Sequence, residues 1–239
     1  MNLSIKVILI ILNEKIKTQI MIKRHINLYM LFIVAILSSC QNNGKKVEST
    51  KAETVNIVST VNTATYKNIK KGSFLKWRAS HLGGIDKRRG EIYYKDATIL
   101  VNKGKLTNIN ITINMDKLTV DDLPNDDAKE LSEHLKSADF FNIEKYPTSK
   151  FELTKLETIQ GKYNSKITGN LLILDVSKNI TFNASINVSE REVSIKSEDF
   201  SIDRAEWGLT YHAEGAKGVP LNYLISDDIG FTVDITVLK

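Results

Sequence analysis

Residues 108–115 read Asn-Ile-Asn-Ile-Thr-Ile-Asn-Met, and this stretch decides the fold class. Its apolar residues fall on one face and its polar residues on the other; the apolar ones are Ile109, Ile111, Ile113 and Met115. A period of two is the pattern of a half-buried β-strand, whereas the apolar residues of a helix recur every three or four positions. The apolar face of this strand is therefore expected to point into the interior of a β protein.

Less regular alternation recurs on both sides of this strand, and turn signals rich in Gly, Asn, Asp and Ser separate the alternating segments. The other predicted strands are 74–79, 92–100, 151–156, 163–174, 180–188, 193–202 and 231–238. About eight short strands, each with one apolar and one wet face, predict a single all-β domain without internal repeats. Its architecture is an antiparallel sandwich or barrel.

One segment, residues 124–136, departs from the β pattern. Its apolar residues are spaced three and four apart, as on one face of a helix; they are Ala128, Leu131 and Leu135. Asp122 is a candidate N-cap with Pro124 in the first turn, and Lys136 at the other end suits the helix dipole. The sequence thus predicts one short helix that closes or caps an end of the sheet.

The N-terminal region has the pattern of an export signal. Lys23, Arg24 and His25 precede a twelve-residue apolar stretch, 26–37, which fits a secretory signal and is too short to cross a bilayer. Small residues then precede Cys40, as in a lipobox, where the thiol takes a diacylglyceryl group and the chain is cleaved before it. Two acyl chains give stable membrane anchoring. The alternative is a structural cysteine after a membrane helix, and the polar residues that follow Cys40 weigh against it.

These patterns divide the chain into three parts. Residues 1–39 are a leader, with Met21 as an alternative start; residues 40–60 are the lipidated cysteine and a flexible polar tether; residues 61–239 are the β domain. We expect an exported protein, anchored in the cell envelope and facing the periplasm or the cell surface.

Charge excludes one class of partner. Five of the 33 Lys and Arg residues and one of the 28 Asp and Glu residues fall in 1–39, which leaves 28 basic against 27 acidic residues and a net charge of +1. The basic character thus belongs mostly to the leader, and no nucleic-acid partner is expected. With Cys40 acylated, no thiol remains for a disulfide or a metal site.

The segment after the predicted helix carries a family resemblance. Residues 134–151 read His-Leu-Lys-Ser-Ala-Asp-Phe-Phe-Asn-Ile-Glu-Lys-Tyr-Pro-Thr-Ser-Lys-Phe. They resemble the signature of the YceI-like family of exported bacterial proteins at His134, Leu135, Ser137, Asp139, Phe140, Phe141, Tyr146, Pro147 and Phe151. Further similar pieces follow in the family's order at 163–173, 176–180 and 202–207, so that the resemblance covers about 65–239.

The resemblance implies a lipocalin-like antiparallel β-barrel whose apolar channel holds a polyisoprenoid or a related long-chain amphiphile. It implies neither catalysis nor a cofactor. After Asp203-Arg204 this chain departs from its relatives, which tend to carry a longer Gly/Ser-rich loop near the channel mouth. The departure leaves the preference for a ligand headgroup open.

The candidate channel residues are aromatic or aliphatic, namely Trp77, Ile109, Ile111, Ile113, Met115, Trp207 and Tyr211. For the aromatic ones the alternative is ordinary core packing, and for Phe140 and Phe141 packing of the helix against the barrel end is favoured. Arg204 is the headgroup candidate because a guanidinium suits a phosphate or a quinone oxygen. Its alternative is an internal ion pair with Asp203 or a neighbouring strand.

We therefore predict a membrane-anchored lipoprotein that sequesters or transports a long-chain lipid such as a polyisoprenoid or a quinone. The alternative is a structural or stress-response envelope protein without a functional ligand. An enzyme is not expected, because no catalytic constellation is recognisable. A metal site is not expected either, because His81, His134 and His212 lie on separate segments. The sequence leaves a homodimer open.

Overall fold

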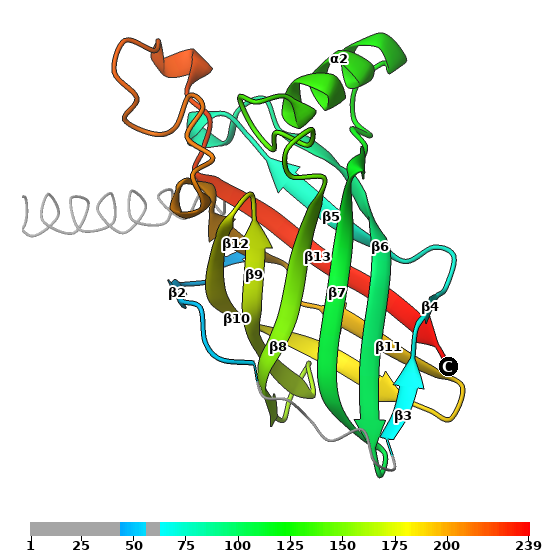
Figure 1. Ribbon diagram of the computed structural model, residues 1–239. Helices are drawn as coiled ribbons and strands as arrows, with labels where there is room; N and C mark the ends of the chain where they lie inside the picture. Colours follow the sequence, from blue (N-terminus) through cyan, green and yellow to red (C-terminus); the bar gives the residue numbers. More distant parts are fainter. Residues whose placement is uncertain (1–43, 56–62) are drawn as a thin grey trace, which may run out of the picture. The chain divides into compact units, whose positions relative to one another are not determined.

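The computed structural model describes residues 44–55 and 63–239, which are mostly β-strands (Figure 1). The strands are β1 (Lys45–Lys46), β2 (Ser49–Lys51), β3 (Thr63–Tyr66), β4 (Asn68–Ile69), β5 (Phe74–Ala79), β6 (Arg88–Asn102), β7 (Lys105–Leu118), β8 (Thr148–Thr158), β9 (Ser165–Ile173), β10 (Val176–Val188), β11 (Glu192–Ser197), β12 (Phe200–Asp203) and β13 (Asp228–Leu238). The helices are α2 (Asn125–Lys136) and three short 3-10 turns, η1 (Leu82–Gly84), η2 (Arg204–Trp207) and η3 (Leu221–Tyr223). Met21 and Cys40 lie outside the described residues, so the leader and the anchor stay predictions. Among the helices of the described ranges, none is long and apolar enough to cross a bilayer.

Eight of the strands form a closed antiparallel barrel, which confirms the predicted fold class and decides between barrel and sandwich. The order around the ring is β5, β6, β7, β8, β9, β10, β11 and β13, and β13 pairs with β5 to close it. Phe231 lies opposite Trp77 in this closing ladder. Because the sheet closes on itself, its inner face becomes a single enclosed core.

Every strand predicted from the sequence is present, with one difference. The stretch 193–202, predicted as one strand, forms β11 and β12. The break falls at Glu198, whose backbone N–H donates to the Asn183 carbonyl oxygen at 2.9 Å, and whose carboxylate accepts from the Asn183 N–H at 2.8 Å. These contacts end the pairing of β11 with β10, and β12 then pairs with β13 and with β1 but not with β10.

The turn between β6 and β7 fixes the register of the decisive strand. Lys103 and Gly104 have φ angles of 49° and 77°, as in the type I′ turns whose twist matches that of two antiparallel strands. Within this hairpin Ile109 lies opposite Ile99, and Ile111 lies opposite Ala97; all four are buried. The period of two therefore places the apolar face of β7 inside the barrel.

Helix α2 lies at one end of the barrel, as Figure 1 shows. Its apolar residues pack against the core, as the stripe predicts; they are Ala128, Leu131 and Leu135. The Ser132 hydroxyl donates to the Leu118 carbonyl oxygen at 3.0 Å. The N-cap differs from the prediction: Pro124 holds that position without a side-chain bond, and the Asp122 carboxylate instead accepts from the Arg89 N–H.

Residues 44–55 correct part of the predicted tether. β1 pairs with β12 and β2 pairs with β10, and the Val47 side chain between them is buried. Backbone groups of a polar segment gain partners when they extend a sheet edge, which propensity within the segment does not reveal. The described part of residues 41–60 is therefore attached to the barrel.

Gly90 in β6 allows a close approach of three strand ends. A Cβ at Gly90 would lie 1.9 Å from the Thr119 carbonyl oxygen and 2.7 Å from Trp77 Nε1. These two atoms are bonded to each other, because the Trp77 indole donates to the Thr119 carbonyl at 2.9 Å. The glycine thus makes room for the bond that fixes Trp77.

We expect Gly90→Ala to lower the free energy of unfolding by about 1–3 kcal/mol, because the added methyl overpacks this contact. Thermal unfolding would show a Tm lower by about 2–4 °C for each kcal/mol lost. Lys95→Ala, at an exposed position of the same strand, is the control and should leave the Tm within about 2 °C. Equal Tm values for the two variants would contradict this packing.

Candidate functional site

The barrel encloses an apolar channel with a cavity of about 80 Å³. Its lining is aliphatic or aromatic apart from Ser149; the residues are Leu75, Ile92, Tyr94, Ile109, Ile111, Ile113, Met115, Phe141, Ser149, Phe151, Ile167, Leu171, Ile173, Ile180, Phe182, Ile195, Phe200, Phe231 and Val233. The Tyr94 hydroxyl donates to the Phe74 carbonyl oxygen at 3.1 Å, and burial raises the pKa of this phenol well above its usual range. The channel therefore presents hydrocarbon and no charge to its contents.

The four predicted channel residues of β7 all line this cavity, namely Ile109, Ile111, Ile113 and Met115. Alternation along β7 brings them there, and cross-strand pairing with β8 adds Phe151 opposite Ile111. Their part in binding a ligand stays a prediction.

A row of four phenylalanines forms one wall of the channel. The rings of Phe182 and Phe200 stack with centroids 4.6 Å apart and planes 5° apart. Phe151 extends the row on one side, 5.8 Å from Phe182, and Phe231 extends it on the other, 6.0 Å from Phe200. Aromatic pairs in this range of distances stabilise each other beyond the area that they bury. The row lines this side of the channel with aromatic rings, of which the central pair is stacked and the outer two are tilted by 53° and 44°.

A larger pocket of about 500 Å³, here called the mouth pocket, lies beneath α2. Its apolar lining comes from the barrel rim and from α2 and the segment after it, and includes Trp77, Leu118, Leu131, Leu135, Phe140 and Phe141. Ile92, Phe141 and Phe231 line both the mouth pocket and the channel cavity, so the two spaces adjoin. The site is thus a narrow apolar channel with a wide outer chamber.

Charged side chains border the mouth pocket and not the channel cavity, and of the polar residues there only Arg204 was predicted from the sequence as a site residue. The polar residues are Ser80, His81, Asp86, Arg88, Asp127, Glu130, His134 and Arg204. His81 Nδ1 lies 3.3 Å from an Asp86 carboxylate oxygen. The apolar stripe of 124–136 is the sequence feature that could have indicated the polar residues of this helix, because a helix that caps a barrel end must bring its polar flank to the rim.

The predicted aromatic residues separate into two groups. Trp77 lines the mouth pocket. Trp207 is fully buried, donates its indole N–H to the Leu171 carbonyl oxygen at 3.0 Å, and lines neither space. Tyr211 also lines neither; its ring packs against His134 and Phe140, with centroids 5.3 and 5.0 Å away. Core packing, the alternative stated for Trp207, describes its surroundings.

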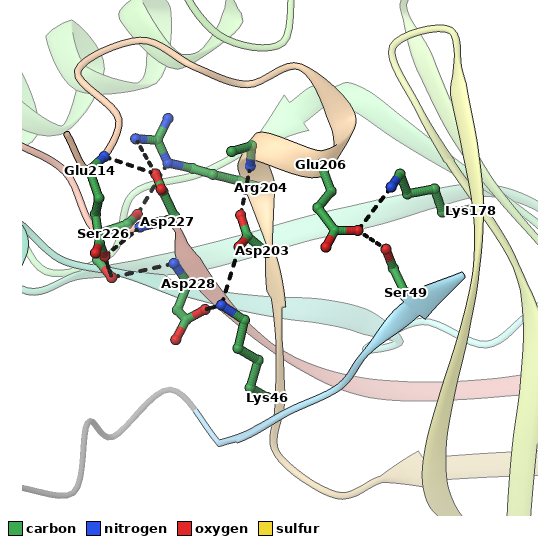
Figure 2. A network of polar contacts seen from close by, with 11 residues as sticks. Lys46, Ser49, Lys178, Asp203, Arg204, Glu206, Glu214, Ser226, Asp227 and Asp228 are labelled. Carbon is green, nitrogen blue, oxygen red and sulfur yellow. Dashed lines mark hydrogen bonds and ion pairs between the residues drawn. The ribbon is translucent and has the colours of Figure 1, made fainter. Parts of the chain in front are cut away.

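Arg204 borders the mouth pocket, but its guanidinium is used inside the protein and is 1% exposed. Nε, Nη1 and Nη2 donate to the carbonyl oxygens of Ser226, Leu209 and Ile225, at 3.1, 2.6 and 3.2 Å. Nη2 also lies 3.4 Å from the Asp227 carboxylate (Figure 2). These contacts do not support a headgroup role; Arg204 instead ties the loop after η2 to the start of β13.

The electrostatics around Arg204 follow from burial. Desolvation lowers the pKa of the Arg204 guanidinium and raises the pKa of the Asp227 carboxyl, and the attraction between the two opposes both shifts. Asp203, the partner named in the alternative, caps the Ala205 N–H and pairs with Lys46 instead. Within the described residues, no three His, Cys, Asp or Glu side chains gather in a set that could hold a metal ion.

Comparison with known proteins adds a family. A family model described as YceI-like domain matches residues 66–237. UPF0312 proteins of Pseudomonas putida strain W619 and of Photorhabdus laumondii are 32% identical over 126 residues and 31% identical over 120 residues. These stretches cover 52% and 48% of this chain, and the chain spans only 62% and 56% of the length of these relatives.

A solved structure also resembles this chain. BcnA of Burkholderia cenocepacia superposes with a TM-score of 0.52 at 14% sequence identity, over 69% of this chain and 95% of that one. The likeness shows a shared fold.

We expect Arg204→Met to lower the free energy of unfolding by about 3 kcal/mol, because Asp227 loses its cationic partner and three carbonyl groups lose the guanidinium that donates to them. Urea unfolding measures this loss, and Arg191→Met, at an exposed position, should change it by less than about 0.5 kcal/mol. An Arg204→Met variant as stable as the unaltered chain would contradict this structural role and make Arg204 a candidate ligand contact again.

Proposed function

Since this chain belongs to the YceI-like family, whose members are generally binding proteins, we propose that it binds a long-chain amphiphile in its channel and mouth pocket. Polyisoprenoids are ligands of this family, and a polyisoprenoid, a quinone or a similar lipid is the class that we propose here. The protein would sequester or transport this ligand within the cell envelope.

The observation that carries the proposal is the junction of the two spaces. An amphiphile needs an apolar place for its tail and a place with polar partners for its head. The channel has the first property and the mouth pocket has both, because apolar residues and charged groups border it together. With its tail between β7 and the phenylalanine row, such a ligand would keep its head beneath α2.

The channel cavity and the mouth pocket differ in size, and so in the part of a ligand that each can hold. Pockets for ligands of drug size measure about 300–1,000 Å³, and the mouth pocket of about 500 Å³ falls in this range. The channel cavity of about 80 Å³ holds a short length of hydrocarbon, unless side chains such as Met115 change rotamer. This narrowness favours one alternative, an envelope protein whose barrel is filled by its own side chains.

The proposal includes the membrane anchor at Cys40. Its support is the order of basic, apolar and small residues before the only cysteine of the chain. An anchored barrel remains close to the bilayer that holds its ligand, and the charge balance of the remaining chain gives no competing reason for membrane binding.

Ile111→Glu is the first test of ligand binding. A carboxylate in the channel must be desolvated, so the variant should lose at least tenfold in the uptake of geranylgeraniol from vesicles, read by native mass spectrometry of the full chain. Asn110→Glu, on the outer face of the same strand, is the matched control and should retain uptake. Ile111→Phe, which narrows the channel without adding charge, should reduce uptake even if Ile111→Glu fails to fold. Uptake unchanged in both Ile111 variants, or absent in the unaltered chain, would favour the filled barrel.

Cys40→Ser tests the anchor separately. We expect the variant to lose the incorporation of labelled palmitate and to move from the membrane to the soluble fraction, while its far-ultraviolet circular dichroism stays unchanged. Ser39→Thr, which keeps the thiol, is the control. Membrane association that survives without Cys40 would contradict lipid anchoring.

A further inference from the structure

The segment 44–53, here called the strap, joins two barrel strands that do not pair with each other at that point. β10 pairs with β11 only from Ala184 to Val188, and β12 pairs with β13 on one edge. The edge of β10 before Ala184 and the free edge of β12 therefore form a seam in the wall. β1 lies parallel to β12 and β2 lies antiparallel to β10, so the strap lies between these two edges.

Backbone contacts hold the strap at β12. The Lys45 and Val47 N–H groups donate to the carbonyl oxygens of Asp199 and Ser201 at 3.2 and 2.8 Å. Gly44 has a φ of +86°, and a Cβ there would lie 2.4 Å from the Asp199 carbonyl carbon. Only glycine combines that angle with so close an approach, so the strap has a seat shaped for its first residue.

Side chains fasten the strap on both sides of the seam (Figure 2). The Lys46 ammonium lies 2.8 Å from the Asp228 carboxylate and 3.2 Å from that of Asp203. Ser49 donates to the Glu206 carboxylate, which also pairs with Lys178 of β10. Farther along, the Asn170 amide donates to the Glu53 carbonyl at 2.7 Å and accepts from the Glu53 N–H at 2.9 Å.

These fastenings are weaker than those of the rest of the wall. Two strap residues pair with β12 and three with β10, whereas nine residues of β10 pair with β9. The Lys46 side chain is 51% exposed, and exposed ion pairs contribute little to stability. Segments with few ladder bonds and exposed polar contacts open at lower free energy than the core. The strap is therefore the part of this wall that can separate first.

The seam lies against the channel. Ile180 and Phe182 on β10 and Phe200 on β12 flank the seam and line the channel cavity. The stacked rings of Phe182 and Phe200 bridge it from the inside, and buried Val47 covers it within the strap. Separation of the strap would leave side-chain contacts alone between the channel and the outside.

The strap also lies close in sequence to the proposed anchor. Lys45 lies five positions after Cys40, a span of at most about 18 Å. The match to the family model begins at residue 66, so the strap lies outside the matched residues. If Cys40 is lipidated, the first strand of the strap cannot be far from the membrane surface.

We propose that the strap is a removable strand of the barrel wall, and that the seam beneath it is a side entrance through which a lipid tail passes between the membrane and the channel. The proposal rests on the proposed function, lipid binding and the Cys40 anchor. The tail would enter the channel between β10 and β12, and the strap would then pair again with both strands, with the head of the loaded ligand beneath α2.

A disulfide across the seam tests this entrance. Lys51 and Lys178 are register partners in β2 and β10, so Lys51→Cys with Lys178→Cys can lock the strap when oxidised. The full chain is placed in phosphatidylethanolamine–phosphatidylglycerol vesicles with radiolabelled geranylgeraniol, and its loading is followed over time. We expect the half-time of loading to rise at least tenfold on oxidation and to return with dithiothreitol, with the final loaded fraction unchanged.

The matched control is Asn110→Cys with Glu152→Cys, which are register partners in β7 and β8, where the wall has no seam. Its oxidation should not change the half-time. Equal loading by the locked and the reduced seam would overturn the side entrance and leave lipid binding intact. Absence of loading in every form, the unaltered chain included, would refute lipid binding and the entrance together.

A variant that loosens the strap should load lipid faster, the opposite of the disulfide-locked form. Asn170→Ala removes both hydrogen bonds to Glu53 and also the acceptor of the buried Asn179 amide. We expect severalfold faster hydrogen exchange at residues 45–51 and faster loading, with a Tm lower by a few degrees because a buried hydrogen bond is lost. Faster exchange in the strap without faster loading would count against the side entrance.

Discussion

The pairing of β13 with both β5 and β11 is the interaction on which the rest of the structure depends. It closes an antiparallel sheet into a ring, and in a ring every inward side chain must share one enclosed space. The alternating residues Ile109, Ile111 and Ile113 are buried in an enclosed core because this ring is closed. Without that closure, the apolar face of β7 would need a second sheet to cover it.

An eight-stranded ring has just enough room for its own side chains, and binding has to be reconciled with this limit. The channel cavity measures about 80 Å³ because Ile and Phe side chains fill most of the interior, whereas the mouth pocket measures about 500 Å³. Helix α2 makes the difference, since it covers the end of the ring without filling it. The packing that stabilises the barrel and the larger open space thus occupy different levels of one fold.

Local sequence patterns predict much of this arrangement. They do not predict contacts between residues that are far apart in the sequence. A period of two in β7 and a spacing of three and four in α2 are visible within a dozen residues. The first correctly predicts a buried face, and the second correctly predicts the face that packs, partly buried, against the core. Trp207 bonds to a carbonyl 36 positions away, and Glu53 bonds to Asn170, 117 positions away. No local rule pairs such residues. The fold class and the β7 lining could therefore be predicted, whereas the Arg204 contacts, the rim of the mouth pocket and the attachment of residues 44–55 could not.

Solvent exposure separates two groups of polar contacts that lie side by side in Figure 2. Arg204 is buried with a partner for each guanidinium nitrogen, so any movement would leave charges and carbonyl groups desolvated and unpaired. Lys46 and Ser49 bind carboxylates at the surface, where water can replace each contact. Similar bonds are thus costly to break at Arg204, on one side of Asp203, and open to replacement by water at Lys46 and Ser49, on the other. Within one network, burial therefore decides which contacts hold the fold and which can open to water.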